Sequence, residues 1–190
     1  MQIKPIYLSL LFVGLILACN NKEFQPKPDA QLALTYDQAS YKFLDIENCP
    51  FQFEMNSSAR LKKPKSPKEC WTNVYYPKQK ATIFITYNSI ENNLDDYLRD
   101  AQKLPLKHSI KAEKIEASQY QNPKQNTYGT FYEVEGDAAS QAQFYLTDSI
   151  QHFLTGSIYF EAAPNYDSIL PAAEYLKKDI RHIMETLSWK

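Results

Sequence analysis

The N-terminal segment constrains this chain more than any other feature of its sequence. Residues 1–18 combine a short basic start at Lys4 with an apolar run from Ile6 to Ala18. A helix needs about 20 apolar residues to cross a bilayer, so this run is too short for a transmembrane segment. The pattern is typical of a signal peptide. We therefore expect a protein that folds outside the cytoplasm, with residues 1–18 excluded from its fold.

A cysteine follows the apolar run directly. Residues 16–19 (ILAC) resemble a bacterial lipobox, in which cleavage occurs before the cysteine and the thiol then carries diacylglycerol. Leu17 differs from the small residue that is usual at its position. We interpret Cys19 as a lipid attachment site and the chain as an anchored lipoprotein; an ordinary secretory signal with a chance cysteine is the alternative. Asn20 is not the aspartate that retains many enterobacterial lipoproteins in the inner membrane, which leaves the outer membrane open without determining the leaflet. The localisation we expect is the cell envelope, with the lipid anchor in the outer membrane and the domain facing the periplasm.

Residues 19–30 are polar and contain Pro26 and Pro28. Such a composition predicts an extended tether. The remaining residues, 31–190, have the length of one ordinary domain and show no internal repeat. We therefore predict a signal peptide, a tether and a single domain, in that order.

Two cysteines remain once Cys19 is assigned to the anchor. Exported chains meet an oxidising compartment, so Cys49 and Cys70 are expected to form a disulfide bond. It would close a loop of about 22 residues and stabilise the fold by roughly 3 kcal/mol. Two free thiols are the main alternative. A metal site is a weaker one, because the sequence lacks a CxxC pair and its three histidines are scattered.

The charge balance argues against a nucleic-acid partner. The chain carries 21 Lys and Arg against 22 Asp and Glu, so it cannot bind nucleic acid through bulk charge. Four glycines in 190 residues leave no glycine-rich loop of the kind that holds phosphates or dinucleotides. We expect no cofactor.

The hydrophobic pattern predicts an α+β domain in which an antiparallel sheet is flanked by helices. Aromatic and β-branched residues alternate with polar ones in a pair of runs around Pro77 and in three later runs. Two segments have the period of an amphipathic helix, the first of them ending at Pro105. Residues 110–120 fit either a strand or a helix. The predicted strands are 71–76, 81–87, 128–135, 142–147 and 152–161, and the predicted helices are 94–104 and 168–187. This order resembles the Mog1/PsbP-like architecture.

Known catalytic motifs are missing from the sequence. Asp148, Ser149 and His152 invite comparison with a hydrolase triad, but they crowd a predicted tight turn in which their side chains would point apart. His108 fits an ordinary surface histidine better than a proton-transfer group. The neighbouring carboxylates Glu133 and Glu135 fit a solvated strand face. We expect a protein that is not an enzyme.

One segment of the predicted disulfide loop is strongly basic. It places five positive charges in nine residues, at Arg60, Lys62, Lys63, Lys65 and Lys68. A solvated, proline-stiffened loop is one interpretation; a contact for an anionic surface, such as lipid headgroups, a cell-wall polymer or an acidic partner, is the other. Several aromatic residues of the predicted strands are expected in the core, namely Tyr75, Tyr76, Tyr145, Phe153, Tyr159 and Phe160.

Long strings of this chain resemble one protein family throughout. They are CWTNVYYPKQKATIFITY (70–87), LKHSIKAEKI (106–115), QFYLTDSIQHFLTGSIYF (143–160), PNYDSI (164–169) and DIRHIMETLSWK (179–190). With the Pro-Lys-Pro tether, they resemble the gliding motility lipoprotein GldD family of the Bacteroidetes. The resemblance implies an envelope lipoprotein that is needed for gliding and for the linked type IX secretion machinery, with envelope proteins of that machinery as partners. It carries over no catalytic residue, and Cys19 alone transfers as a functional residue.

These expectations leave two classes of function open. The first is an interaction protein that assists the assembly or stability of motility and secretion components. The second is an envelope-anchored module that binds a small ligand or the cell wall, which a deep aromatic pocket would favour.

Overall fold

The computed structural model describes residues 36–65, 68–106, 111–161 and 165–190. The predicted signal peptide, Cys19, the tether and His108 lie outside these residues. The elements in chain order are β1 (Tyr41–Asp45), β2 (Phe51–Asn56), β3 (Arg60–Lys62), β4 (Thr72–Tyr76), β5 (Ala81–Ser89), α2 (Leu94–Leu106), β6 (Ala112–Asn122), η1 (Pro123–Gln125), β7 (Thr127–Gly136), β8 (Ala142–Thr147), β9 (His152–Phe160), α3 (Tyr166–Thr186) and β10 (Ser188–Trp189).

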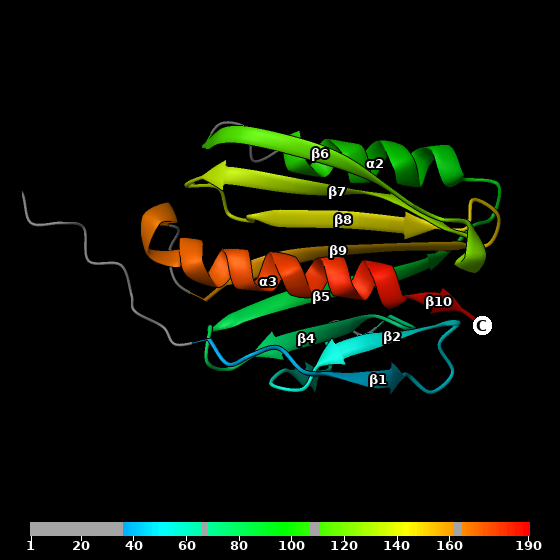
Figure 1. Ribbon diagram of the computed structural model, residues 1–190. Coiled ribbons are helices and arrows are strands. Elements are labelled where there is room, and N and C mark those ends of the chain that lie inside the picture. The colour runs from blue at the N-terminus through cyan, green and yellow to red at the C-terminus, as the bar shows by residue number, and fades with distance from the viewer. Residues whose placement is uncertain (1–35, 66–67, 107–110, 162–164) are drawn as a thin grey trace, which may run out of the picture. The chain divides into compact units, whose positions relative to one another are not determined.

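Seven of the strands form one antiparallel sheet in the order β3-β4-β5-β9-β8-β7-β6 (Figure 1). Neighbours along the chain mostly pair as hairpins, and β9 returns to insert between β5 and β8. The short β3 and the long β6 are therefore the two edge strands of the sheet.

The other three strands form a small sheet in the order β1-β2-β10. Its central strand, β2, packs against α3 and contributes Phe51, Phe53 and Met55 to the core. Because β10 follows α3 directly and pairs with β2, the C-terminus is held against this sheet.

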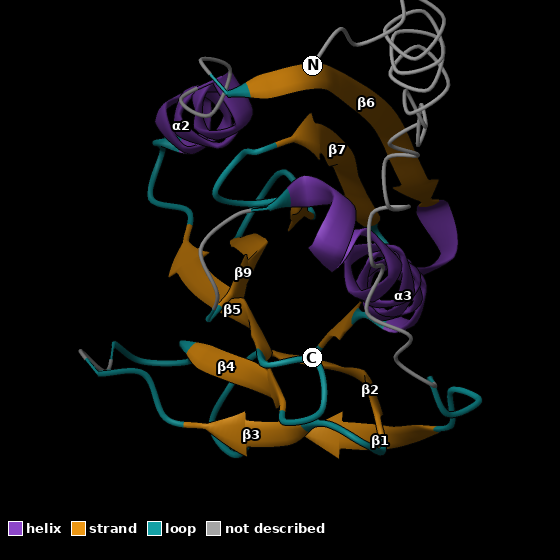
Figure 2. Cartoon of the chain, turned by 90° about the vertical axis from the view of Figure 1, so that its left-hand side faces the viewer, coloured by secondary structure: helices purple, strands orange, loops and turns teal. Residues whose placement is uncertain are grey.

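Helices α2 and α3 lie on opposite faces of the large sheet (Figure 2). Tyr97 of α2 stacks on Phe153 of β9, with 5.3 Å between the ring centroids. The next strand residue, Leu154, belongs to the same core cluster as Leu176 and Ile180 of α3. Successive residues of a strand point to opposite faces of the sheet. Phe153 therefore faces α2, and Leu154 faces the side that α3 covers.

A buried carboxylate connects α3 to the small sheet. Asp179 is 1% exposed; its Oδ1 accepts a hydrogen bond from the Tyr41 hydroxyl at 2.8 Å and its Oδ2 one from Asn56 Nδ2 at 2.8 Å. Asn56 Nδ2 also lies 2.9 Å from the hydroxyl oxygen of Tyr175, one turn earlier on α3. Burial raises the pKa of Asp179, and the hydrogen bonds from Tyr41 and Asn56 counteract this rise only in part.

The α+β prediction is confirmed, with an antiparallel sheet and a helix on each face. The ambiguous segment 110–120 proves to be β6. The prediction that Pro105 ends the first helix is wrong by one residue. Pro105 lies within the last turn of α2, which continues to Leu106. A proline there removes only one backbone hydrogen bond, and its φ is compatible with a helix, so the termination comes one residue later.

Candidate functional site: a basic and aromatic sheet face

The disulfide bond connects the chain after the basic segment to the start of the small sheet's central strand. Cys49 lies just before β2 and Cys70 just before β4; they are bonded, with their Cα atoms 5.3 Å apart. Cys49 is buried, whereas Cys70 is partly exposed. The covalent bond fixes the return of the chain into β4, so the basic residues between β3 and Cys70 project from a closed loop.

The five basic residues do not form one patch. Arg60 and Lys62 are opposite Tyr75 and Asn73 of β4, and directly paired residues share a face of the sheet. Lys63 lines, together with Lys62 and Leu61, a cavity of about 480 Å³ beside the disulfide bond. The two remaining lysines follow on the exposed loop, at Lys65 and Lys68.

Arg60 and Lys62 continue into a row of aromatic side chains on the same face. The register places Tyr75 of β4, Phe84 of β5 and Tyr159 of β9 on one side of the sheet. Phe84 is 41% exposed and meets the Tyr159 ring edge-on, with 5.6 Å between centroids. The Lys62 ammonium lies 3.0 Å from the centroid of the Tyr75 ring. We call Arg60, Lys62, Tyr75, Phe84 and Tyr159 the basic-aromatic face.

This arrangement corrects the prediction that all the strand aromatics are core residues. Tyr76, Tyr145 and Phe153 are buried, and Phe160 packs partly buried against the core. Tyr75 and Tyr159, by contrast, are only half-buried on the α2 side of the sheet. The reason is the position of α2, which packs on β8 and β9 and contacts the remaining strands of that face little or not at all. Partial burial also raises the pKa of Tyr159.

The charged side chains that the paired strands contribute to the basic-aromatic face are all positive. At the paired positions of β3, β4, β5 and β9 on this side, the described strand residues are basic, aromatic, hydroxyl- or amide-bearing, and none is acidic. A cation over an exposed aromatic ring stabilises by about 0.5–1 kcal/mol, which holds Lys62 in place without neutralising it. The face can therefore pair an aromatic contact with an anionic group.

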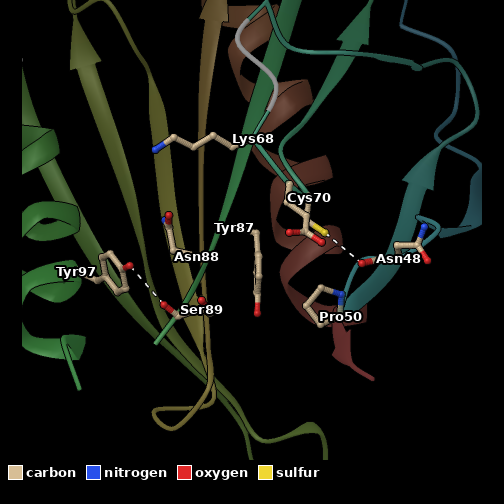
Figure 3. Close-up of a pocket in the computed structure, with 9 residues that line it drawn as sticks. Asn48, Pro50, Lys68, Cys70, Tyr87, Asn88, Ser89 and Tyr97 are labelled. Carbon is tan, nitrogen blue, oxygen red and sulfur yellow. Dashed lines mark hydrogen bonds between the residues drawn. The ribbon is translucent and has the colours of Figure 1, made fainter. Parts of the chain in front are cut away.

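A cavity of about 410 Å³ lies between the disulfide bond and α2 (Figure 3). Tyr87 and Tyr97 face it from β5 and α2, and Lys68 and Glu69 enter it from the loop. The Tyr97 hydroxyl donates a hydrogen bond to the Ser89 carbonyl at 3.4 Å. We call this space the disulfide cavity; it offers polar groups of both charges and two aromatic rings.

Comparison with known proteins identifies the family. The family described as gliding motility lipoprotein GldD matches residues 21–189, nearly the whole chain after Cys19. The chain belongs to the GldD family. No curated protein matches it.

The fold is similar to a solved structure from another family. The solution structure of cyanobacterial PsbP (CyanoP) from Synechocystis sp. PCC 6803 aligns with a TM-score of 0.50 and 9% sequence identity, covering 87% of this chain and 100% of that one. At this identity the likeness shows the fold, which is PsbP-like as the sequence predicts, and carries no function.

Membership of the GldD family associates the chain with gliding motility and with lipoprotein anchoring at the envelope. In the part of the chain that the structure describes, α2 and α3 are both too short or too polar to cross a membrane. Cys19, the predicted lipid attachment site, lies just before the matched residues.

The residues that suggested a hydrolase triad have other roles in this GldD-family chain. Asp148 Oδ1 accepts backbone N–H groups of Ile150, Gln151 and His152 at 3.0, 2.8 and 2.8 Å. Burial opposes ionisation of Asp148, but these donors outweigh it and lower its pKa. The His152 ring contacts the Tyr87 hydroxyl at 2.9 Å and stacks on Trp189, so the histidine is directed away from Ser149.

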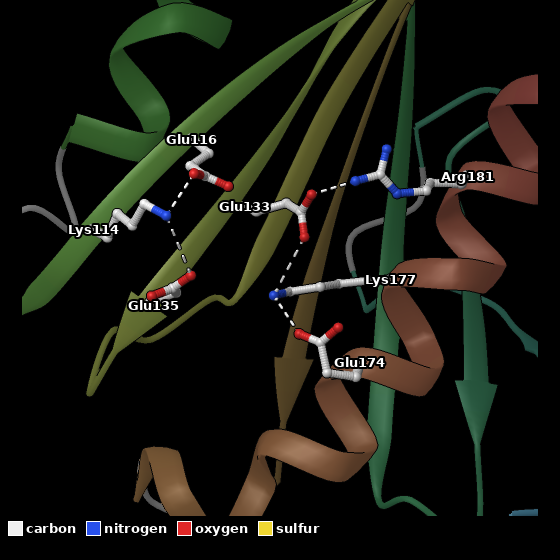
Figure 4. Close-up of polar contacts among 7 residues, drawn as sticks. All are labelled: Lys114, Glu116, Glu133, Glu135, Glu174, Lys177 and Arg181. Carbon is white, nitrogen blue, oxygen red and sulfur yellow. Dashed lines mark hydrogen bonds and ion pairs between the residues drawn. The ribbon is translucent and has the colours of Figure 1, made fainter.

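The prediction that Glu133 lies on a solvated strand face is wrong. Glu133 belongs to an ion-pair cluster that connects α3 to β7 (Figure 4). It pairs with Arg181 and lies 3.5 Å from Lys177, which is 4% exposed and also contacts Glu174 at 2.7 Å. Burial alone would lower the pKa of Lys177, but the bond to Glu174 and the charge of Glu133 raise it. On the neighbouring strand, Lys114 pairs separately with Glu116 and Glu135.

Sequence reasoning missed Phe84 as a candidate contact. Its signal was present, because in the run ATIFITY the buried Ile83 and Ile85 flank it, and alternation places Phe84 on the opposite face. The pattern alone did not show which face α2 leaves open.

Proposed function

We propose that this chain is a lipid-anchored, non-catalytic assembly or stability factor of the cell envelope that supports gliding motility and the linked type IX secretion machinery. Its family supports a role in gliding. The observation that carries the proposal is the basic-aromatic face, where the exposed Phe84 lies on the same side of the sheet as Arg60 and Lys62. Such a combination is typical of contact surfaces, in which aromatic residues and arginine are enriched.

The partner that fits this face is an acidic surface of an envelope protein. Arg60 and Lys62 supply the positive charge, and the sheet residues beside them add no carboxylate. An acidic partner would be steered to the face by its charge and held by contact with Phe84 and Tyr159. Anionic lipid headgroups carry the same negative charge as an acidic protein and could also contact Arg60 and Lys62. In that case the face would bind the membrane and would need no protein partner.

The anchor is proposed to place this face at the outer membrane, facing the periplasm. Cys19 is the residue that would carry the lipid. We expect Cys19→Ala to move the protein from the membrane fraction to the soluble periplasmic fraction. A variant that stays membrane-bound and acylated would contradict the anchor.

Charge reversal on the face tests the proposed contact. A deletion strain is complemented with wild type, with Arg60→Glu/Lys62→Glu, or with Phe84→Ser, and colony spreading and secreted type IX cargo are measured on the same plates. The matched control is Lys63→Glu/Lys65→Glu, which changes the net charge equally and leaves the sheet face intact.

We expect the face variants to lose spreading and secretion at unchanged protein level, and the loop control to retain both. Equal behaviour of the face variants and the control would contradict a role for this face. Pelleting of the wild-type domain with phosphatidylglycerol vesicles, abolished by Arg60→Glu/Lys62→Glu, would assign the face to the membrane and not to an acidic protein.

A second candidate function, the binding of a small envelope ligand, is favoured by the disulfide cavity. Its volume of about 410 Å³ and its lining by Tyr87, Tyr97 and Lys68 suit a small polar molecule. Calorimetric titration with oligomers of N-acetylglucosamine tests this candidate. Saturable binding that Lys68→Ala and Tyr97→Phe weaken would favour it, and absence of heat would count against it for cell-wall sugars.

A further inference from the structure

β6 is the longest strand of the large sheet and forms one of its edges (Figure 2). It spans eleven residues and pairs with β7 along its whole length. On its other side, no strand pairs with it within the described parts of the chain. Every second residue of β6 therefore presents its backbone N–H and C=O groups to whatever lies beyond the edge.

The opposite edge of this sheet is protected in ways that the end of β6 is not. β3 has three residues and runs into Lys62-Lys63-Pro64. Short length, lysine and proline are common devices against unwanted strand pairing. The first half of β6 has comparable protection, because it contains a bulge between Ala112 and Lys114 and carries charged side chains.

The second half of β6, residues 117–122 (ASQYQN), has no charged residue, no proline and no bulge. Ala117, Ser118, Gln119 and Gln121 are exposed. This is a neutral, solvent-facing edge that is twice as long as β3. We call residues 117–122 the open edge.

A cavity of about 230 Å³ lies beside the open edge, on the α2 side of the sheet. Gln119 and Gln121 form its rim and Leu98 of α2 its opposite wall. Its base consists of strand side chains with hydroxyl groups, among them Thr130 and Tyr145, which hydrogen-bond each other at 3.0 Å. We call it the edge cavity; its size and lining suit one side chain with an amide or hydroxyl group.

We propose that the open edge accepts an extended segment of a partner protein as an additional antiparallel strand. The segment is neutral where it pairs with residues 117–122, and it places one amide- or hydroxyl-bearing side chain in the edge cavity. Backbone hydrogen bonds supply affinity and the cavity supplies selectivity, which is the division of roles in strand addition. The antiparallel direction follows the rest of the sheet and is the more stable one per residue. This surface lies at the other edge of the sheet from β3, so it does not depend on the function proposed for the basic-aromatic face.

A photo-crosslinking scan in living cells tests the proposal. The full chain, expressed in the deletion strain, carries p-benzoylphenylalanine in place of Ala117, Gln119 or Gln121, and in place of the exposed Lys103 of α2 as a control. Cross-linked peptides are sequenced by mass spectrometry. Side chains at the three strand positions point to the same face, so an added strand meets them in order.

We expect adducts with one protein from the three strand positions and none from Lys103. From Ala117 to Gln119 and from Gln119 to Gln121, the cross-linked residue should move about two residues towards the N-terminus of the partner, because antiparallel pairing fixes that register. Absence of adducts above the control, linked residues in no order, or adducts with a second copy of this chain would each overturn the proposal.

A blocking variant adds a quantitative readout. With the photo-residue at Gln121, Gln119→Lys should lower adduct yield about ten-fold, since an unpaired charge at an edge opposes strand addition. Gln102→Lys on exposed α2 is the matched control and should leave the yield unchanged. Thermal melting of both variants verifies that they fold. Equal yields in two folded variants would overturn the proposal.

Discussion

Asp179 offers a sharp test of how the small sheet is held to α3. Its two carboxylate oxygens accept hydrogen bonds from Tyr41 of β1 and Asn56 of β2, both at 2.8 Å, in a place that is 1% exposed. A hydrogen bond to a charged group contributes about 1.5–3 kcal/mol. The cost of burying the carboxylate offsets part of the sum. We expect Asp179→Ala to lower the free energy of unfolding by about 3 kcal/mol.

Urea unfolding of the purified domain, followed by circular dichroism, measures this loss. At an m-value of about 2 kcal/mol/M, the midpoint should fall by about 1.5 M. Tyr41→Phe is the matched variant, because it removes one donor and keeps the ring that stacks on His182; it should lose about half as much. A midpoint for Asp179→Ala equal to that of wild type, or above it, would refute the reasoning and show that desolvation outweighs the hydrogen bonds.

The pH dependence gives the same carboxylate a second test. The folded-state pKa of Asp179 is raised by burial, so ionisation in the folded state costs stability as pH increases from the ordinary carboxyl value through the raised one. Asp179→Asn does not ionise. The stability of Asp179→Asn relative to wild type should therefore improve with pH across that window, as urea titrations at about pH 3 to about pH 7 would measure. A constant difference, or one that changes in the opposite direction, would contradict the raised pKa.

Three further predictions concern the frame of the sheet. Cys70→Ser should lower the free energy of unfolding by about 3 kcal/mol under non-reducing conditions, since the bond closes a loop with a sequence separation of 21. Gly129→Ala should destabilise by about 3 kcal/mol or more in urea, because the added Cβ would overlap the Tyr145 carbonyl oxygen. Asp148→Ala should lose about 2 kcal/mol at neutral pH; because the pKa of Asp148 is lowered, the wild-type advantage should be present above the ordinary carboxyl pKa and disappear as pH falls through the lowered one.

Much of the fold was predictable because its central strands are short aromatic and β-branched runs bounded by turn residues. β8 was predicted at its observed bounds, and β5 and β9 within two residues. Apolar and polar positions alternate at the start of β5, whereas β8 is buried on both faces and β9 over much of its length. β6 was ambiguous because an exposed edge strand buries little and so has no clear period. β1, β2, β3 and β10 were all missed; they are short and depend on pairing with partners that lie elsewhere in the sequence.

The candidate site was less predictable than the fold. The basic segment was visible in the sequence, but the position of Arg60 and Lys62 beside Tyr75 depends on the register of β3 with β4. Asp179 lies in the periodic pattern of a helix and gives no sign of its partners, which are more than 120 residues away along the chain. Long-range pairing, and not local propensity, decides both features.

The secreted proteome of a clean deletion strain, with colony spreading scored on the same plates, tests the central proposal most directly. We predict that type IX cargo disappears from the medium, that spreading is lost, and that the wild-type gene restores both. Unchanged secretion together with intact spreading would contradict the proposal that this GldD-family chain supports the motility and secretion machinery.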